Sequence, residues 1–399
     1  MTLIECFDSS PIENIIATLK LKPDRVVFIS NEKKMNREVE RYRVLLKNRN
    51  INPVINLYDL KKNENIADIL IKFIENEDEC VLDLTGGEEA TIFTIAMTIS
   101  ELDDTLREKV SIQRFNFNTF ASDCDSDGDF FKGTPANLTV RELIELYGGK
   151  IHPETEQPDK CYTPENINLL WNAMRNNPKN WNKMISALNE FESQTTGDTI
   201  QFSLSDKKKD ISNFEYKEKL FKNALTKLRL NDIIIDNSGR DRICYTYKNP
   251  LYHECVKKQG NLLEMKVFLE ARAFKENGTP FFNDCRMSVN IDWDGITTGS
   301  PNTRNEIDII LMKDATPIFV SCKNGNIPEE ELYKLHTVAE EFGGEYAKKM
   351  LIATSLDGTT SFPLGFVQRA KDMGIILIQN ARSFEKQDWE QVFRKIFEN

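Results

Sequence analysis

The chain has 399 residues, a formal net charge of −11, and 40% hydrophobic and 29% charged residues. A chain of this length is expected to fold into more than one domain. Its composition is that of a globular protein and excludes an intrinsically disordered one. The negative charge argues against a large, constitutive nucleic-acid surface, although it leaves room for a local basic groove. No apolar run reaches the roughly 18 residues of a membrane span, and the first residues lack a signal-peptide pattern, so we expect a cytoplasmic protein.

Residues 1–150 alternate strand patterns with helix patterns. The strand patterns are TLIECF (2–7), RVVFIS (25–30), INPVINLY (51–58), CVLDLTGG (80–87) and VSIQRFNFN (110–118), with helical patterns such as 36–49 and 88–104 between them. That alternation predicts a mostly parallel sheet with helices on both faces, a Rossmann-like domain of the α/β class. Such domains bind ligands beyond the C-terminal ends of their strands.

Two turns at those strand ends have the composition of a ligand site. FDSSP (7–11) leads from the first strand into a helix, and DLTGGEEA (83–90) ends the fourth strand. Two glycines let the backbone approach a phosphate or nucleotide closely, and free N–H groups of the following helix can bind it. The glutamates at 88 and 89 would repel a bare phosphate, which favours a ligand recognised partly through sugar and base. A plain strand-to-helix turn explains the TGG sequence equally well.

The segment 160–255 has a different pattern. Two short helices at TPENINLLWNAM and NWNKMISALNEF, a longer helix at 214–230, and a hairpin formed by 232–237 and 242–249 are predicted. Helices followed by a two-stranded wing predict a winged-helix-like module. Eight basic residues lie between Lys207 and Arg229. They could contact nucleic acid, but a role in dimerisation or as a spacer fits the pattern equally well.

The last segment, 256–399, begins with an amphipathic helix at 259–274. Three strands in a meander are predicted at 287–293, 305–312 and 317–324, followed by a helix at 329–342, a strand at 349–355, a helix around 363–372 and a strand at 374–379. This order predicts a C-terminal domain that is again of the α/β class.

Polar residues converge at the ends of two of these strands. Because side chains alternate along a strand, Glu306 and Asp308 are expected on one face of their strand, and Ser321 and Lys323 on one face of the next. A carboxylate cluster beside a lysine can hold Mg²⁺ or Mn²⁺, and the lysine can orient an attacking water and neutralise charge that builds on a phosphate. An edge strand with one solvated face is the alternative explanation for the serine and the lysine.

These residues carry a resemblance to a known family. The order Glu264, Asp308, Ser321-Cys322-Lys323 resembles the PD-(D/E)xK core of restriction-endonuclease-like nucleases, in which a helical Glu, a strand Asp and an (E/D)xK tripeptide form the site. The sequences GNLLE (260–264), NEID (305–308), SCKNG (321–325) and LHTVAEEFGG (335–344) resemble CRISPR-associated ancillary nucleases with an N-terminal CARF domain. The DLTGGEE turn is similar to CARF domains as well, so the resemblance covers essentially the whole chain.

The tripeptide departs from the family pattern because it begins with Ser321 rather than with Glu or Asp. A hydroxyl is a weak, neutral metal ligand, so the site lacks one carboxylate. Either Glu306 supplies the missing carboxylate, or the metal is held by Asp308, Glu264, the backbone carbonyl of Cys322 and water. A nuclease fold that has lost its activity is the alternative, although the other motif residues are retained.

The resemblance implies a CARF sensor at 1–150, a winged-helix-like linker module at 160–255 and a nuclease at 256–399. It implies a homodimer with one cyclic oligoadenylate, most simply cyclic tetra-adenylate, across the two-fold axis between paired CARF domains. By match of position, the pocket for this activator contains Ser9, Ser10, Thr85, Gly86, Gly87 and Glu88, together with Ser30 and Asn31.

The resemblance also implies a nuclease dependent on Mn²⁺ or Mg²⁺. Its catalytic residues would be Glu264, Asp308, Ser321, Lys323 and Glu306, and its metal ligands Glu264, Asp308 and the Cys322 carbonyl. Related nucleases in type III CRISPR antiviral defence cut single-stranded RNA or DNA, or nick duplex DNA. Two rival functions are a transcription regulator that senses the same ligand with an inert C-terminal domain, and a nucleotide-dependent metabolic enzyme. The second is disfavoured because no GxGxxG or Walker lysine follows an early strand.

Overall fold

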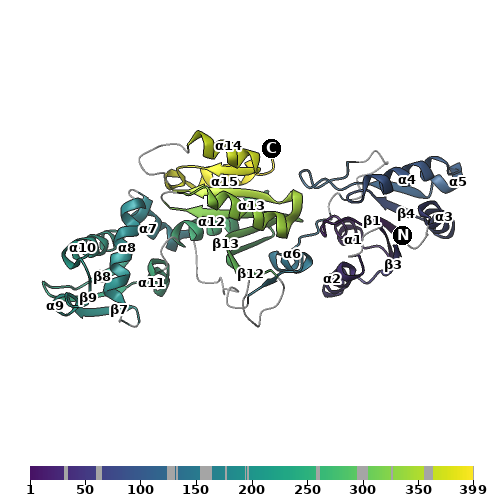
Figure 1. The fold of residues 1–399 in the computed structure, drawn as a ribbon. Helices are drawn as coiled ribbons and strands as arrows, with labels where there is room; N and C mark the ends of the chain where they lie inside the picture. The colour runs from purple at the N-terminus through teal and green to yellow at the C-terminus, as the bar shows by residue number, and fades with distance from the viewer. Residues whose placement is uncertain are drawn as a thin grey trace.

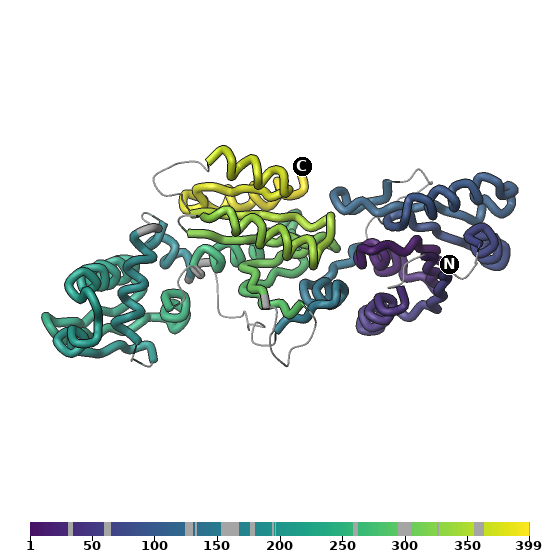
Figure 2. The backbone as a smooth tube through the Cα atoms, viewed as in Figure 1, coloured from purple at the N-terminus to yellow at the C-terminus, as the bar shows by residue number. Residues whose placement is uncertain are grey.

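The structure is a computed structural model, and it describes the chain apart from residues 31–34, 60–64, 124–130, 132–133, 153–163, 176–177, 194, 196, 258–260, 294–303, 325–326, 355–362 and 399. Three bodies lie in a row (Figure 1). The N-terminal body stands at one end, residues 178–257 form the other end, and a body built around the C-terminal sheet lies between them. After the N-terminal body, the chain contributes a first segment to the middle body, then forms the far body, and then returns to form the rest of the middle body (Figure 2). None of the helices described is long and apolar enough to cross a membrane.

The N-terminal body is a parallel five-stranded sheet in the order β3-β2-β1-β4-β5. Its strands are β1 (Thr2–Cys6), β2 (Arg25–Ser30), β3 (Val54–Asp59), β4 (Cys80–Asp83) and β5 (Val110–Gln113), and its helices are α1 (Ile16–Leu21), α2 (Met35–Asn48), α3 (Ile66–Asn76), α4 (Glu89–Ser100) and α5 (Asp104–Arg107). The strand order reverses between β1 and β4, so the space beyond their C-terminal ends is the topological switch point where ligands of such sheets bind. The predicted parallel α/β fold is confirmed.

The middle body contains a mixed six-stranded sheet in the order β16-β15-β14-β13-β12-β6. Its strands are β6 (Lys150–Ile151), β12 (Asp284–Asp292), β13 (Arg304–Lys313), β14 (Thr316–Lys323), β15 (Lys348–Ala353) and β16 (Ile375–Ile378), and its helices are α6 (Val140–Leu146), α12 (Asn261–Ala273), α13 (Glu330–Gly343), α14 (Leu364–Asp372) and α15 (Lys386–Lys395). A minor hairpin of β10 (Lys275–Glu276) and β11 (Thr279–Pro280) follows α12, and the single-turn helices η4 (Gly344–Tyr346) and η5 (Ala381–Ser383) complete the set. The predicted meander of β12, β13 and β14 and the helices and strands after it are present.

Residues 140–150, which the sequence predicted as part of the first segment, pack in the middle body. Strand β6 pairs antiparallel with β12, and α6 contacts the same strand. Thr139 and Glu142 form a reciprocal capping box that starts α6, and the Val140 N–H donates to Asp284 at 2.9 Å. The chain therefore reaches the C-terminal sheet before residue 150, and the capping box at Thr139 is a signal in the sequence for this earlier boundary.

The far body has the helices and wing that the sequence predicted. Its elements, with α7 linking it to the middle body, are α7 (Pro164–Arg175), α8 (Pro178–Glu192), β7 (Thr199–Ser203), α9 (Leu204–Lys207), α10 (Phe214–Leu230), β8 (Ile234–Asp236), β9 (Arg242–Tyr247) and α11 (Pro250–Lys257). Strand β7 was missed, and it makes the wing a three-stranded sheet in the order β7-β9-β8. Buried Glu192 accepts hydrogen bonds from Tyr245 and Tyr247 and contacts His253, so this body has a polar core contact of its own.

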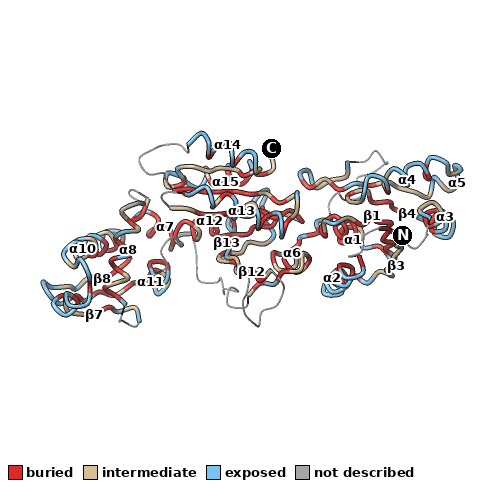
Figure 3. The backbone as a smooth tube through the Cα atoms, in the orientation of Figure 1, coloured by how far each residue is buried: buried red, intermediate tan, exposed pale blue. Residues whose placement is uncertain are grey.

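Hydrophobic packing connects the three bodies. One buried cluster runs from the N-terminal sheet through α6 to the face of the C-terminal sheet that α13 and α14 cover. A second runs from the far body through α7 and α12 to the opposite face, where α15 also packs. A third lies between the N-terminal sheet and helices α3 and α4. Buried segments accordingly fill the centre of each body, while exposed segments follow the outer helices (Figure 3).

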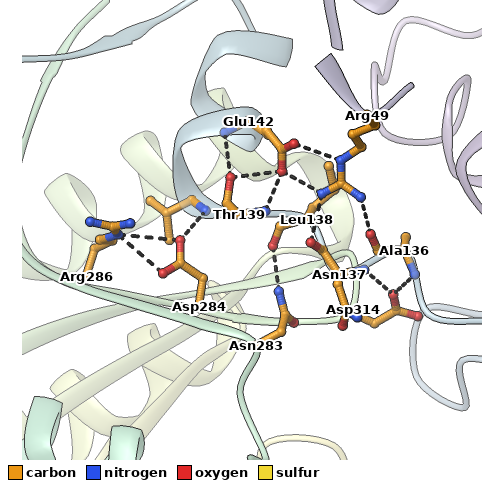
Figure 4. A network of polar contacts seen from close by, with 11 residues as sticks. Arg49, Ala136, Asn137, Leu138, Thr139, Glu142, Asn283, Asp284, Arg286 and Asp314 are labelled. Carbon is orange, nitrogen blue, oxygen red and sulfur yellow. Dashed lines mark hydrogen bonds and ion pairs between the residues drawn. The ribbon is translucent and has the colours of Figure 1, made fainter. Parts of the chain in front are cut away.

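A polar network fixes the N-terminal body to the turn between β13 and β14 (Figure 4). Lys20 of α1 is 4% exposed, and its Nζ lies 2.6 Å from Asp314 Oδ2 in that turn. Asp314 Oδ1 accepts the backbone N–H groups of residues 136–137, whose carbonyls accept hydrogen bonds from Arg49. Arg49 also donates to both oxygens of Glu142, at 2.7 and 2.6 Å. The connection between the two strands that carry the predicted active site is thus held by the N-terminal body.

Candidate functional site

The candidate active site lies where β14 ends, and Asp308 of β13 is at its centre. Asp308 Oδ2 accepts a hydrogen bond from the Cys322 backbone N–H at 2.6 Å and another from the Ser321 hydroxyl at 3.1 Å. Lys323 Nζ lies 3.5 Å from the same oxygen. The antiparallel pairing of β13 with β14 places these groups side by side. The structure therefore brings together the aspartate and the tripeptide that the sequence analysis selected.

Strand alternation is interrupted at Asp308. Ile307 packs in the cluster on one face of the sheet and Ile309 in the cluster on the other, whereas regular alternation puts residues i and i+2 on one face. The β12–β13 pairing skips Ser288, whose φ of +50° marks a local distortion of β12. Glu306 and Asp308 both line a cavity of about 100 Å³, but regular alternation is not what places them there.

Glu306 is exposed in this cavity. Its carboxylate makes no hydrogen bond or ion pair with the part of the chain that the structure describes. A carboxylate that is exposed and unengaged is available to a cation, but nothing in its surroundings holds it toward Asp308. Its role as the missing ligand therefore stays a prediction.

Lys323 lies between two carboxylates, one of which the sequence analysis did not select. Its Nζ is 2.9 Å from Glu331 Oε2 on the first turn of α13, closer than the 3.5 Å to Asp308. Lys334, one turn along α13, places its Nζ 2.8 Å from Glu331 Oε1. Burial lowers the pKa of Lys323, but the two carboxylates outweigh burial and hold the pKa above its usual value. Glutamate is common in the first turn of a helix, so no sequence signal distinguished Glu331 from its glutamate neighbours.

Two carboxylates act on Cys322 from different elements. The Cys322 side chain is buried, and burial raises the pKa of its thiol, which the charges of Asp308 on β13 and Glu264 on α12 raise further. Carboxylates and a backbone carbonyl are the oxygen donors that Mg²⁺ and Mn²⁺ prefer, and Mg²⁺ commonly takes one or two carboxylates with water. This donor set fits such an ion. Within the described ranges, no group of three or more His, Cys, Asp or Glu side chains is placed to hold a metal.

A contact from the far body reaches the end of β14. Asn324 follows Lys323, and its Nδ2 donates to Asn182 Oδ1 of α8 at 2.8 Å, while Asn182 Nδ2 donates to the Asn324 carbonyl at 3.3 Å. Thr354, after β15, donates its hydroxyl to Asn324 Oδ1 at 2.5 Å and its N–H to the Lys323 carbonyl at 3.1 Å. The winged-helix-like module is therefore tied to the strand end that carries the lysine.

At the switch point of the N-terminal sheet, Asp8 ties the two predicted ligand turns together. Asp8 Oδ1 accepts the Ser10 N–H at 3.0 Å and the Ser9 hydroxyl at 3.1 Å, and Oδ2 accepts the Gly87 N–H at 3.1 Å. Asp8 was not among the predicted ligand residues. An aspartate whose side chain accepts the N–H two residues on is an Asx turn, so the Asp-Ser-Ser sequence carried a signal for it.

The packing of the turn itself requires its two glycines. Gly87 has a φ of +113°, and a Cβ there would lie 2.4 Å from the Cys6 Cβ. A Cβ at Gly86 would lie 3.0 Å from the Asp8 Cβ and 3.1 Å from the Glu13 Cβ. The close approach that the sequence suggested for a ligand is therefore used by β1 and the turn that follows it.

A buried carboxyl pair lies beneath these turns. Glu5 of β1 and Asp83 of β4 face each other in the parallel register, and each is 1% exposed. Burial raises the pKa of Glu5 well above its usual value and the charge of Asp83 raises it further, while burial raises the pKa of Asp83 to about 6. Because both pKa values are raised, the protonated member of the pair can donate a hydrogen bond to the other carboxyl group.

Thr85 connects this pair to the turn above it. Its N–H and hydroxyl donate to Asp83 Oδ1 at 3.1 and 2.6 Å, and its hydroxyl accepts the Phe115 N–H at 2.8 Å. Both functions of the hydroxyl are thus occupied, and Thr85 supports the turn. Of the other predicted ligand residues, Glu88 is the exposed N-cap of α4, Ser30 is buried at the end of β2, and Asn31 lies outside the described residues.

The turn after β1 lines a pocket of about 740 Å³ between the N-terminal body and the C-terminal end of α13. Carboxylates dominate its lining, with two arginines among them: Asp8, Glu13, Glu38, Glu340, Glu341 and Glu345, and Arg37 and Arg41. Burial and the charge of Asp8 raise the pKa of Glu13 to about 7. The volume suits a ligand of nucleotide size, and the arginines are the groups that could pair with phosphate.

Comparison with known proteins agrees with this arrangement. Residues 256–389 match the model of the family described as "Card1-like, endonuclease domain". The matched range contains Glu264, Asp308 and the tripeptide at 321–323. Among curated proteins compared by sequence, none matches this chain.

Solved structures similar to this chain extend over nearly all of it. Protein VC1899 from Vibrio cholerae has a TM-score of 0.72 and 16% identity, with 100% of this chain and 98% of that chain covered. Can2 from Sulfobacillus thermosulfidooxidans, solved in complex with cyclic tetra-adenylate, has a TM-score of 0.61 and 16% identity, with 99% and 97% covered. A type III CRISPR defence DNA nuclease activated by cyclic oligoadenylate has a TM-score of 0.51 and 12% identity over 91% of this chain and 47% of that one. The chain has the fold of these proteins, and its function is argued from its sites.

Proposed function

We propose that this protein is a metal-dependent endonuclease that a cyclic oligoadenylate, most simply cyclic tetra-adenylate, activates in type III CRISPR antiviral defence. The observation that carries the proposal is the cluster of Asp308, Lys323 and the Cys322 backbone at the end of β14, inside the range that matches a Card1-like endonuclease domain. The activator is supported by the fold shared with Can2 along nearly the whole chain. The hydrogen bond from the Gly87 N–H to Asp8, which joins the turns after β1 and β4 at the switch point of the first sheet, also supports it.

The residues of the cluster would have distinct roles in hydrolysis. Asp308, Glu264 and the Cys322 carbonyl would hold Mg²⁺ or Mn²⁺, which supplies Lewis-acid stabilisation of the phosphate oxygens when bound. Lys323 keeps its ammonium charged between Asp308 and Glu331. That ammonium orients an attacking water and balances the negative charge that develops on the phosphate.

The first position of the tripeptide contributes without a charge. The Ser321 hydroxyl donates to Asp308 and so orients that carboxylate. Glu306, exposed in the same cavity, is our candidate for the missing carboxylate. Manganese titration of Glu306→Gln tests this: a weaker Mn²⁺ affinity than that of the wild type supports it, and an unchanged affinity rejects it.

The activator would bind beyond the C-terminal ends of β1 and β4. Ser9, Ser10 and the backbone around Gly86 and Gly87 offer hydrogen-bonding groups there, and Glu88 begins the helix that follows. The acidic pocket beside them accommodates phosphates only near its arginines. Recognition therefore depends on ribose and adenine, for which carboxylates and hydroxyls are suitable partners.

Helix α4 supports a homodimer. Phe93 is 68% exposed and Met97 is 48% exposed, one turn apart on a helix that begins directly after the Gly86-Gly87 turn. An exposed aromatic and a methionine provide an apolar surface for a second copy. Two-fold pairing there would bring two ligand turns together around one ring-shaped ligand. Light scattering on Phe93→Lys should show monomers where the wild type is dimeric.

The direct test combines the purified chain with Mn²⁺, cyclic tetra-adenylate, and labelled single-stranded RNA, single-stranded DNA and supercoiled duplex DNA. We expect cleavage of at least one substrate that requires both the metal and the activator. Asp308→Asn is the matched inactive control, since it keeps the shape of the side chain and removes its charge. Activator binding without cleavage of any substrate would instead favour the transcription regulator, and absence of both would reject the proposal.

A further inference from the structure

We propose that Glu331 is a positioning residue for Lys323, and that α13, which carries it, links it to the ligand turn after β1. This inference rests on the proposed nuclease function and deepens it, because it names a residue outside the recognised motif and a route by which the sensor reaches the catalytic lysine.

The two carboxylates around Lys323, Asp308 and Glu331, make different contacts. Asp308 Oδ2 already accepts hydrogen bonds from Cys322 and Ser321, and the same side chain is the candidate metal ligand. Glu331 Oε2 lies 2.9 Å from Lys323 Nζ, and the other oxygen of Glu331 contacts Lys334 of the same helix. A cation at Asp308 would draw that carboxylate away from the ammonium. Glu331 then remains the group that fixes the lysine.

Glu331 is itself held in place. Its side chain is 17% exposed, and its two oxygens contact different ammonium groups, Oε2 with Lys323 and Oε1 with Lys334 at 2.8 Å. With both oxygens engaged by cations, Glu331 is poorly suited to coordinate a metal. It is well suited to restrain a long, flexible lysine, since positioning a reacting group within a few tenths of an ångström matters for rate.

The C-terminal end of α13 lies beside the turn after β1. The helix has 14 residues, about 20 Å of length, and η4 continues it to Tyr346. The Tyr346 hydroxyl interacts with the carboxyl groups of Glu13, just beyond the turn after β1, and of the neighbouring Glu345. A Cβ at Gly344 would lie 3.4 Å from the Ser10 hydroxyl. One end of α13 therefore touches the predicted activator turn, and the other holds Lys323.

The test of positioning uses the full-length activated protein with Mn²⁺. Glu331→Gln keeps the shape and removes the charge, Glu331→Asp keeps the charge, and Glu330→Gln removes the same charge from an exposed neighbour that does not touch Lys323. We expect Glu331→Gln to lower kcat about 10- to 100-fold. KM, the activator Kd and the Mn²⁺ Kd from calorimetry should stay within about twofold, Glu331→Asp should recover part of kcat, and Glu330→Gln should match the wild type.

Each other outcome has a defined meaning. Normal kcat in Glu331→Gln overturns the inference. So does a weaker Mn²⁺ affinity, which would make Glu331 a metal ligand. A loss that follows a lower melting temperature and is not recovered by Glu331→Asp would assign Glu331 to folding and also overturn it. If the activated wild type cuts nothing, the proposed function fails, and that result is distinct from all of these.

The link along α13 is tested at its other end. Tyr346→Phe removes the hydroxyl that interacts with Glu13, and Tyr333→Phe makes the same change at an exposed position of the same helix. We expect Tyr346→Phe to reduce the rate increase caused by the activator about tenfold, and Tyr333→Phe to leave it unchanged. In a double-mutant cycle, Tyr346→Phe should add little to Glu331→Gln. Fully additive effects would overturn the link.

Discussion

Each candidate site has a pair of carboxyl groups, and the two bodies compensate the negative charge of these groups in different ways. In the N-terminal sheet, Glu5 and Asp83 face each other, and no lysine or arginine among the described residues forms an ion pair with either. Burial raises both pKa values, so the pair holds a proton. At the end of β14, Asp308 and Glu331 instead flank Lys323, which keeps its ammonium charged.

This difference separates a scaffold from a reactive site. A carboxyl pair that holds one proton carries a single negative charge and can form a strong internal hydrogen bond, so it is suited to fixing Thr85 and the turn above it. A lysine between carboxylates keeps its full charge for a developing phosphate anion. Carboxyl pKa values are raised at the proposed activator site, whereas the pKa of Glu331 is lowered at the proposed nuclease site.

The largest expected effect is at the charged cluster. Lys323→Gln leaves Asp308 and Glu331 without their shared cation and removes the group that balances phosphate charge, so the activated cleavage rate should fall at least about 100-fold. Activator binding should be retained. Lys334→Gln, which removes the other and more exposed cation of Glu331, is the matched control and should cost much less. Near-normal turnover in Lys323→Gln would show that the lysine between the two carboxylates has no role in cleavage.

The next largest effect is expected at the turn above the buried pair. In Gly87→Ala the new methyl group would lie 2.4 Å from Cys6 at a φ of +113°, so the turn must shift and lose its bond to Asp8. We expect activator affinity, measured with labelled cyclic tetra-adenylate, to fall about tenfold or more.

Gly239→Ala supplies the control for that substitution, because a Cβ there meets nothing closer than 3.8 Å. It should bind the activator normally. If Gly87→Ala binds as tightly as the wild type, the turn over the Glu5–Asp83 pair is not the sensor.

The sequence predicted much of this arrangement for identifiable reasons. Strand–helix alternation predicted the parallel sheet, and the tripeptide Ser321-Cys322-Lys323 with Asp308 predicted the strand end at which the candidate site lies, because both depend on local pattern. The face shared by Glu306 and Asp308 was argued from alternation, which the distortion at Ser288 interrupts. A distortion in a partner strand leaves no mark in the residues of the strand that it alters.

Contacts between residues far apart in the sequence were also not predicted. Glu5 is an ordinary strand residue until β4 places Asp83 opposite it. Glu331 is one of several helix-start glutamates until α13 packs beside Lys323. Asn182 lies 142 residues from Asn324. Each contact exists only once the chain has folded, and a single sequence without a recognised motif at these positions does not predict it.

A smaller, pH-dependent effect on stability should distinguish Glu5 from Glu331. The folded-state pKa of Glu5 is raised above its unfolded value of about 4.3, so its contribution to stability is complete in acid and is lost as pH rises through the folded pKa. With Asp83 at about 6, the melting temperature should fall as pH rises from about 5. Glu5→Gln, which stays neutral and can still donate to Asp83, should flatten that decline and melt a few degrees higher at pH 8.

Glu331 has the opposite sign and serves as the control for that experiment. Burial raises the pKa of Glu331, but Lys334 and Lys323 outweigh burial and hold the pKa below its usual value. Its contribution is present above the unfolded pKa and is lost as pH falls through the folded one. Glu331→Gln should therefore lower the melting temperature at neutral and alkaline pH, and its difference from the wild type should shrink as pH falls through the folded pKa. The same slope for both variants would show that the two carboxylates are not neutralised differently.

The smallest effect is expected where the far body meets β14. Asn182→Ala removes two hydrogen bonds to Asn324 but leaves Thr354 bonded to Asn324 and to the Lys323 carbonyl, so the strand end keeps part of its support. A net contribution of about 1 kcal/mol per hydrogen bond, acting one residue from the lysine, should lower kcat only a few-fold. Asn182→Asp retains an acceptor for the Asn324 amide and should be intermediate, while Asn180→Ala on the same helix is the control. A loss as large as that of Lys323→Gln would mean that the winged-helix-like module belongs to the catalytic site. No change in either Asn182 variant would leave it as a spacer.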